Sequence, residues 1–368
     1  MMLGLLLARA GIDVVVLEKH ADFLRDFRGD TIHPSTLEVM HELGVLDELL
    51  EQPYQQLPQL RALIGGAEVV VADFSRLPTQ CPFIALMPQW DFLTFLAQQA
   101  RRYPTFNLRM QAEVTELIEE AGRIVGVRAT TPGTPLEVRA GLVVGADGRT
   151  SVVRDRSGLT VEDIGAPMDG LWMRLSKKSG DPAVSLRFDR GKILVMLDRG
   201  AYWQCAFVIA KGSEEAARRK GIESLRAAIV EIAPFLGDRV GELTDWSAIK
   251  LLTVKVDRLR QWYRPGLLCI GDAAHAMSPI GGVGINLAIQ DAVAAANILA
   301  RPLRQGVVTA DHLARVQRRR GLPTRLTQRF QVILQKQLIA RVLATPERVV
   351  LPWPHRLMFR SKFLSRVR

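Results

Sequence analysis

The chain has 368 residues, 48% of them hydrophobic, and carries 49 Lys and Arg against 38 Asp and Glu, a formal net charge of +11. This apolar content suffices for a large core and about two domains. The sequence contains no apolar run of about eighteen residues without a charge, so we expect no membrane-spanning helix. Residues 301–368 hold 16 of the basic and only 2 of the acidic side chains, so the charge belongs to the C-terminal region and argues against a nucleic-acid-binding function for the whole chain.

The first predicted elements are a helix over residues 3–10 and a buried parallel strand over residues 13–18. Gly11 stands where a glycine commonly ends a helix. The strand ends in Glu18, and in a dinucleotide-binding βαβ unit an acid at this place bonds the adenosine ribose. The preceding strand and GxGxxG turn of such a unit are absent. We therefore expect a doubly wound, Rossmann-like α/β domain that is truncated at its N-terminus and lacks a strand in the middle of its sheet.

The middle of the chain alternates between helical and strand-like patterns. Helices are expected from Pro34 to about Leu50, over 91–102 and over 214–230, and strands over 61–74, 107–145 and 165–210. The last of these segments is divided by Gly, Asp and Lys turns, which is typical of an antiparallel sheet. The sequence therefore predicts a second, β-rich domain beside the α/β domain.

A first motif, Gly145-Ala-Asp-Gly-Arg-Thr-Ser-Val-Val-Arg154, follows the apolar strand that ends at Gly145. It predicts a turn from a strand to a helix that holds Asp147 at the strand end. Asp147 could equally be a simple N-cap of the following helix, which requires no ligand.

A second motif runs from Gly266 to Asn286, GLLCIGDAAHAMSPIGGVGIN. It predicts a short buried strand, a sharp turn with Asp272, a glycine-rich loop and a helix from about Asn286. Glycines let the backbone approach a flat ligand where a Cβ would collide, and the helix N-terminus supplies N–H donors to it. His275 is interpreted as a structural histidine.

Together the two strings resemble the DGxxSxxR and GDAAHxxxPxGGxGxN motifs of the flavin-dependent aromatic hydroxylases, the family typified by para-hydroxybenzoate hydroxylase. The resemblance covers roughly residues 1–345. It implies a discontinuous FAD-binding domain (1–60, 88–160 and 250–310), a substrate-binding β-sheet domain (61–87 and 161–249) and a basic C-terminal helical region (311–368). In the family a glycine-rich turn precedes a segment like residues 1–11, which supports the expected truncation.

The resemblance also assigns cofactor-binding residues. It implies that Asp272 binds the ribityl chain of FAD and that the first motif contacts both FAD and NAD(P)H. The helix after the loop would direct its positive end at the flavin. The residues expected to bind the cofactor are Glu18, Lys19, Arg28, Gln89, Asp147, Gly148, Asp272, Pro279, Gly282, Gly284, Ile285 and Asn286.

The implied reaction is a monooxygenation in which NAD(P)H reduces FAD, O₂ adds to form a flavin C4a-hydroperoxide, and one oxygen passes to a small hydrophobic, aromatic or polyketide-like substrate. No catalytic side chain is assigned, because the cofactor carries the chemistry. The residues available to line a substrate pocket are Trp172, Met173, Phe188, Met196, Trp203 and Phe207. Two alternatives stay open, a related flavin-dependent reductase or dehydrogenase of a lipid-like substrate and an inactive, truncated remnant.

The basic C-terminal region contains an amphipathic helical pattern with apolar residues at Leu322, Leu326, Phe330, Ile333 and Leu334. Packing against the FAD-binding domain is the first explanation, and contact with an anionic membrane surface is the second. Three scattered cysteines and an N-terminus without a basic leading region favour a cytoplasmic protein. No Cys/His spacing predicts a metal site, and neither the oligomeric state nor the choice between NADH and NADPH follows from the sequence.

Overall fold

The computed structural model describes residues 1–24, 31–184, 186–345 and 347–348. The chain folds into two compact units. Unit 1 comprises residues 1–30, 88–165 and 255–329, and unit 2 comprises residues 31–87, 166–254 and 330–368. Residues 31–60, which the family resemblance assigns to the FAD-binding domain, belong to unit 2 in this division.

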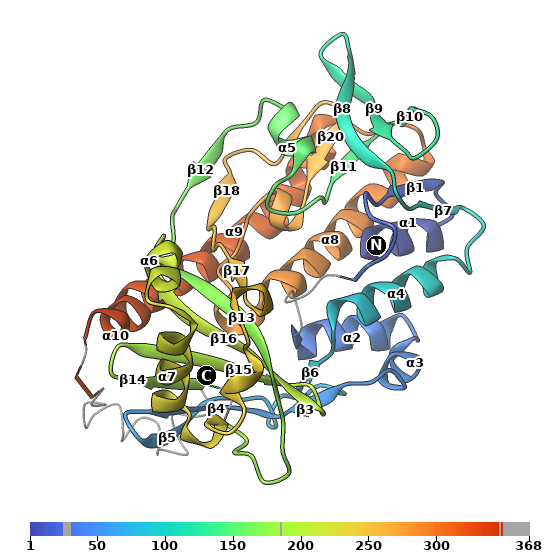
Figure 1. Ribbon diagram of the computed structural model, residues 1–368. Coiled ribbons are helices and arrows are strands. Elements are labelled where there is room, and N and C mark those ends of the chain that lie inside the picture. The colour runs from blue at the N-terminus through green and yellow to red at the C-terminus, as the bar shows by residue number, and fades with distance from the viewer. Residues whose placement is uncertain (25–30, 185, 346, 349–368) are drawn as a thin grey trace. The chain divides into compact units, whose positions relative to one another are not determined.

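Unit 1 contains both motifs, and Figure 1 shows its helices α1, α4 and α8 side by side. Its elements are α1 (Met2–Arg9), β1 (Val14–Leu17), α4 (Gln89–Ala100), β7 (Phe106–Arg109), β8 (Glu113–Glu120), β9 (Arg123–Thr130), β10 (Leu136–Arg139), β11 (Val143–Gly145), α5 (Val152–Arg156), β12 (Val161–Asp163), β18 (Asp257–Leu259), β19 (Tyr263–Arg264), β20 (Leu267–Cys269), α8 (Gly284–Arg304) and most of α9 (Ala310–Leu334).

The parallel strands of unit 1 form two separate ladders. β1 pairs with β7, with Val14 opposite Phe106, and β11 pairs with β20, with Val143 opposite Leu267. Within the described residues no ladder joins β1 to β11. Helix α1 lies so close to the first ladder that a Cβ on Gly4 would be 2.9 Å from both Val16 and Phe106.

Helix α8 is a core helix of unit 1. Leu287, Ile289, Ala295 and Leu299 are buried along it. By length and composition, the segment Ile280–Arg304 is the one described helix that could also cross a membrane, with a mean hydropathy of 1.4. The same composition is expected of a helix packed on several sides within a soluble unit.

Helix α9 differs from the packing predicted for it. Its apolar residues Leu322 and Leu326 are 57% and 58% exposed, while Thr324 and Gln328 on the opposite side are buried. The rotation of α9 about its axis is set in its first turns, where Leu313 is buried. The face that buries Leu313 continues along the helix to the buried side chains of Thr324 and Gln328. The prediction that the apolar residues pack against the core is therefore wrong for this helix.

Unit 2 is built on a seven-stranded sheet of order β17-β13-β16-β15-β14-β4-β5. All neighbouring pairs are antiparallel except β14 and β4. Its elements are β2 (Thr31–Ile32), α2 (Pro34–Glu42), α3 (Leu46–Leu50), β3 (Gln55–Leu57), β4 (Gln59–Ile64), β5 (Ala67–Asp73), β6 (Ile84–Leu86), β13 (Met168–Ser176), β14 (Leu186–Asp189), β15 (Lys192–Asp198), β16 (Tyr202–Ala210), α6 (Glu214–Arg219), α7 (Ile222–Ile232), β17 (Lys250–Leu252) and α10 (Ala340–Ala344).

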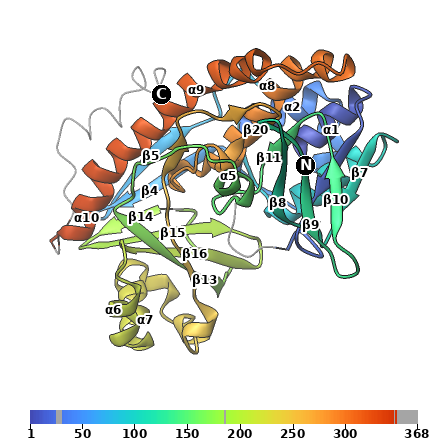
Figure 2. The same cartoon turned by 90° about the horizontal axis from the view of Figure 1, so that it is seen from above.

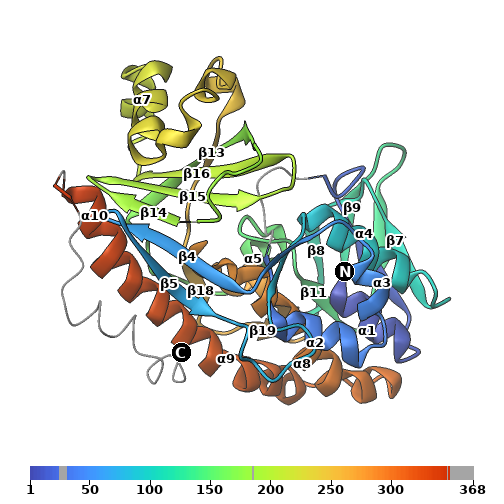
Figure 3. The same cartoon turned by 90° about the horizontal axis from the view of Figure 1, so that it is seen from below.

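One face of this sheet is covered by α7, as Figures 2 and 3 show from opposite sides. Side chains of β13, β15 and β16 pack there against Leu225, Ile229 and Ile232 of α7. Four of the residues proposed to line a pocket belong to this core cluster, namely Met173, Met196, Trp203 and Phe207. Because side chains alternate across a strand, the half-buried Trp172 of β13 lies on the other face.

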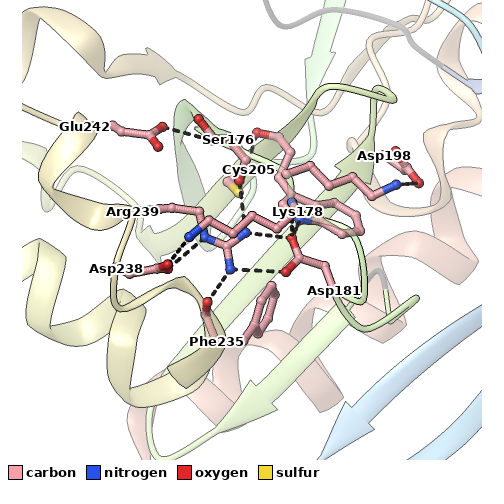
Figure 4. A network of polar contacts seen from close by, with 11 residues as sticks. Ser176, Lys178, Asp181, Asp198, Cys205, Phe235, Asp238, Arg239 and Glu242 are labelled. Atoms are coloured by element: carbon pink, nitrogen blue, oxygen red, sulfur yellow. Dashed lines mark hydrogen bonds and ion pairs between the residues drawn. The ribbon is translucent and has the colours of Figure 1, made fainter.

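A buried ion pair connects the loop after β13 to the segment after α7 (Figure 4). Arg239 donates to Asp181 at 2.6 and 3.1 Å, and both side chains are about 5% exposed. Trp203 donates its indole N–H to the same carboxylate at 2.7 Å. Burial raises the pKa of Asp181, but these bonds and the Arg239 charge outweigh it and lower that pKa to about 2.

The mixed α/β fold with an antiparallel sheet and C-terminal helices confirms the predicted fold class. Two helix predictions need a correction, since residues 34–50 contain two helices, α2 and α3, and residues 214–230 lie in two helices, α6 and α7. Gly44 lies between the first two with a φ of +74° and Gly221 between the second two with a φ of +83°, a conformation that interrupts a helix and suits glycine.

Candidate functional site

The two motifs meet in unit 1 because each begins where one of two adjacent parallel strands ends. β11 leads into the first motif and β20 into the second, and Ile270 donates its N–H to the carbonyl of Gly145 at 2.9 Å. The carboxyl ends of parallel strands lie at the same edge of a sheet, where α/β proteins commonly bind ligands. A Cβ on Gly145 would be 2.8 Å from Val153, so the first turn requires glycine at this point.

The first motif is a tight turn fixed by its own polar side chains. Gly148 has a φ of +85°, and Asp147 accepts from the Ser151 hydroxyl at 2.5 Å and from the Val153 N–H at 3.1 Å. The N-cap of α5 is Ser151, whose hydroxyl accepts from the Arg154 N–H, and not Asp147. Asp147 therefore orients the cap, although its side chain reaches the solvent.

Arg154 ties this turn to β18 and to the second motif. Its guanidinium is buried, donates to Asp257 at 3.2 Å and donates to the carbonyl of Arg149 at 2.7 Å. Asp257 in turn accepts the N–H of Ala276 at 3.4 Å. The DGxxSxxR pattern contains Arg154 but gave no indication of its distant partner Asp257.

Asp272 lies in a short 3₁₀ turn, Gly271–Ala273, directly after β20. Its Oδ2 accepts from Arg149 Nε at 3.1 Å, and Arg149 also reaches the carbonyl of Met277 at 3.5 Å. Both side chains are just under one third exposed. Arg149 is a residue that sequence reasoning missed, because it occupies a variable position of the first motif.

The glycine-rich loop connects Asp272 to α8. Gly281 and Gly282 have positive φ angles of 77° and 61°. Asn286 donates its side-chain amide to the carbonyl of Gly282 at 3.1 Å, which closes the loop onto the first turn of α8. Pro279, Gly282, Gly284 and Ile285 are half-buried and line this segment. The helix begins at Gly284, close to the predicted start, and its N-terminal N–H groups lie at the loop.

A buried acid on α8 holds the turn that carries Asp272. Asp291 is fully buried, and its Oδ2 accepts the Gly271 N–H at 3.0 Å and lies 2.6 Å from His275 Nε2. Its Oδ1 accepts from Arg320 Nε of α9 at 2.8 Å. Burial raises the pKa of Asp291, but the charge of His275 and the bonds from His275 and Arg320 outweigh it, so the pKa lies below its usual value. His275 is buried and its Nδ1 has no partner among the described residues, and its interpretation as a structural histidine stays a prediction. Asp291 was missed.

The remaining predicted residues lie elsewhere. Glu18 follows β1, is half-buried and accepts the N–H of His20 at 3.0 Å. Lys19 is exposed and lies 3.8 Å from Glu113. Gln89 is the half-buried first residue of α4. Arg28 lies outside the described residues.

These features suit a flat, polar cofactor such as FAD. The loop between Asp272 and α8 presents backbone at two positive-φ glycines, and Asp272 offers a carboxylate beside it. One nitrogen of Arg149, Nη1, is buried without a hydrogen-bond partner among the described residues, as expected where a polar ligand completes a site. No group of three His, Cys, Asp or Glu residues that could hold a metal occurs in the described part of the chain.

Comparison with known protein families gives one match, to the FAD binding domain, over residues 1–329. The chain is 32% identical over 343 residues to the 6-methylpretetramide 4-monooxygenase of Streptomyces rimosus, covering 92% of this chain and 81% of the relative. It is 25% identical to the para-nitrophenol 4-monooxygenase of Pseudomonas sp. (strain WBC-3), covering 83% and 76%.

A solved structure has the same fold. The p-nitrophenol 4-monooxygenase of Pseudomonas putida DLL-E4 superposes with a TM-score of 0.79 at 20% identity, covering 100% of this chain and 92% of that one.

Proposed function

The chain belongs to the FAD-binding domain family of flavin-dependent aromatic monooxygenases, and from this premise we propose that it uses FAD, NAD(P)H and O₂ to hydroxylate a small aromatic or polyketide-like substrate. The observation that carries the proposal is the junction of the two motifs through Arg149 and Asp272 at one edge of the parallel sheet. The names of the two relatives, a pretetramide and a nitrophenol monooxygenase, support this substrate class.

In this proposal the chain supplies binding and orientation. Asp272 would accept from the ribityl hydroxyls, and Glu18 from the adenosine ribose. Gly282, Gly284, Ile285 and Asn286, with Pro279 before them, would bind the flavin part of the cofactor. Lys19, Arg28, Gln89, Asp147 and Gly148 complete the proposed cofactor-binding set.

Bound FAD would supply the redox chemistry that activates O₂. The net reaction consumes NAD(P)H, a proton, O₂ and the substrate C–H, and yields NAD(P)⁺, water and the substrate C–OH. The N-terminus of α8 would stabilise negative charge that develops beside the loop, through the macrodipole of the helix. The buried Asp291 holds the turn at Gly271, so little reorganisation of this turn would be needed when the charge forms.

The experiment that tests this function is a screen of phenols and polyketide-like aromatics with FAD, NADH or NADPH and ¹⁸O₂. Substrate-dependent NAD(P)H oxidation with one ¹⁸O in the product supports a monooxygenase. Oxidation of NAD(P)H with a reduced product and no ¹⁸O supports the alternative, a flavin-dependent reductase of a lipid-like substrate. Failure to bind flavin at all supports an inactive remnant.

We also propose that α9 contacts an anionic membrane surface. Leu322, Leu326 and Phe330 follow one another at intervals of four residues and are 57%, 58% and 62% exposed. Arg325 and Arg329 are exposed between them. An apolar stripe flanked by arginines suits the boundary between acyl chains and anionic headgroups. The contact is compatible with the cytoplasmic location that the sequence favours.

A further inference from the structure

The ion pair between Arg149 and Asp272 uses only one of the two carboxylate oxygens of Asp272. Arg149 Nε donates to Oδ2 of the carboxylate at 3.1 Å, while Oδ1 lies 3.8 Å from the position of a Cβ built on Gly284, at the junction of the glycine loop and α8. One carboxylate oxygen is thus occupied from the side of the first motif, and the other is directed to the loop.

Arg149 is itself held at both of its ends. Its carbonyl accepts from the buried Arg154 at 2.7 Å, and its guanidinium also reaches the carbonyl of Met277 at 3.5 Å. Arg154 is anchored by Asp257. Each of these contacts involves a charged guanidinium, and each acceptor is a carboxylate or a main-chain carbonyl. The residues of the first motif therefore determine the orientation of the Asp272 side chain.

We infer that Arg149 is a positioning residue, which holds the Asp272 carboxylate oriented so that Oδ1 is presented to the hydroxyls of FAD. The inference rests on the proposed function, since it assumes that Asp272 binds FAD. A carboxylate that is already oriented loses less side-chain entropy on binding than one that rotates freely. Removing Arg149 therefore weakens FAD binding through Asp272.

A direct contact between Arg149 and the cofactor is the competing explanation, because Nη1 of Arg149 has no partner among the described residues. The two explanations differ in a double-mutant cycle. A residue that acts through Asp272 has no effect once the carboxylate has been removed. A residue that contacts FAD itself keeps its effect in that background.

The test is a titration of the apoprotein with FAD, followed by flavin fluorescence and by the induced visible circular dichroism, in Arg149→Gln, Arg149→Lys, Asp272→Asn and the double variant Arg149→Gln/Asp272→Asn. Arg264→Gln is the matched control. Arg264 is 25% exposed and likewise donates to a carboxylate, that of Glu119, and to main-chain carbonyls, those of Ser157 and Gly122, but it lies in β19. Arg149→Met, which keeps the aliphatic stem, replaces Arg149→Gln if that variant does not fold.

We expect Arg149→Gln to raise the Kd for FAD about tenfold, Arg149→Lys to restore most of the affinity, and Arg264→Gln to bind as the wild type does. In the Asp272→Asn background, Arg149→Gln should add no further loss. Wild-type affinity in Arg149→Gln, or a loss of equal size with and without Asp272, overturns the inference and leaves the proposed function intact. A wild-type chain that binds no FAD overturns both.

Discussion

The carboxylate of Asp291 accepts the backbone N–H of Gly271 at 3.0 Å, although the two residues are separated by 20 positions and by the whole glycine-rich loop. The same carboxylate binds His275 and Arg320, so three segments of unit 1 converge on one fully buried charge. The turn that presents Asp272 is therefore determined by a residue of α8 that cannot itself reach a ligand in solvent.

Asp291→Ala should cost about 3–5 kcal/mol of the free energy of unfolding, because it leaves Arg320 and the Gly271 N–H buried without their acceptor. Urea unfolding measures the loss. Asp311→Ala is the control, since its pair with Arg318 is more than 60% exposed on both sides and should contribute less than about 1 kcal/mol. Similar losses in the two variants would contradict the role given to Asp291.

Two glycines of unit 1 test two different reasons for which a position requires glycine, namely a left-handed backbone conformation and a lack of space for a side chain. Gly266 and Gly148 have positive φ angles of 78° and 85°, but a Cβ on Gly266 would lie 1.9 Å from the carbonyl oxygen of Ile124, whereas a Cβ on Gly148 meets nothing within 4 Å. Gly148→Ala should therefore cost about 1–2 kcal/mol, the penalty of a left-handed residue. Gly266→Ala should cost well over about 3 kcal/mol or prevent folding. Thermal unfolding measures the stability of the two variants. Equal losses of stability would show that the contact between Gly266 and the carbonyl of Ile124 tolerates a side chain.

The Asp181–Arg239 pair of unit 2 predicts a pH dependence of stability. The pKa of Asp181 is lowered to about 2 in the folded protein, from an ordinary value near 3.8. A lowered carboxyl pKa stabilises the fold above the ordinary value, and this stabilisation is lost as the pH falls toward 2. The loss is about 2 kcal/mol.

Asp181→Asn removes this titration. Between pH 4 and pH 2 its free energy of unfolding should fall less steeply than that of the wild type, measured by urea unfolding at fixed ionic strength. Asp311→Asn is the control, because Asp311 lies in unit 1 and its pair with Arg318 is more than 60% exposed on both sides. Parallel pH profiles of wild type and Asp181→Asn would contradict the assignment.

The exposed stripe on α9 predicts binding to anionic vesicles. The protein should sediment with phosphatidylglycerol vesicles and not with phosphatidylcholine vesicles, and added salt should weaken the binding. Leu326→Gln/Phe330→Gln should abolish it. Val307→Gln, which changes an apolar residue of similar exposure outside α9, should leave it unchanged. Equal sedimentation of the stripe variant and the wild type would exclude this surface.

The sequence predicted most of the fold because its signals are local. The strand in residues 13–18, the strands in residues 61–74 and the helix after the glycine loop each follow from hydrophobic period and turn residues. The two motifs were found for the same reason, since each is a continuous string at the end of a strand.

What the sequence did not predict is the pairing between distant segments. Asp291, Arg149 and Asp257 look like ordinary polar residues until the fold brings them to Gly271, Asp272 and Arg154. The register of α9 was also missed, because its periodic apolar residues predicted a buried stripe. Tertiary bonds from Arg320 and Gln328 instead fix the polar side of that helix inward.

The most direct test of the proposed function is the visible absorption spectrum of the purified chain after incubation with excess FAD and desalting. The account predicts a retained flavin spectrum in the wild type, and a loss of most of that flavin in Asp272→Ala. A colourless wild-type protein that is folded by circular dichroism, or full flavin retention in Asp272→Ala, would contradict the assignment of this site to FAD.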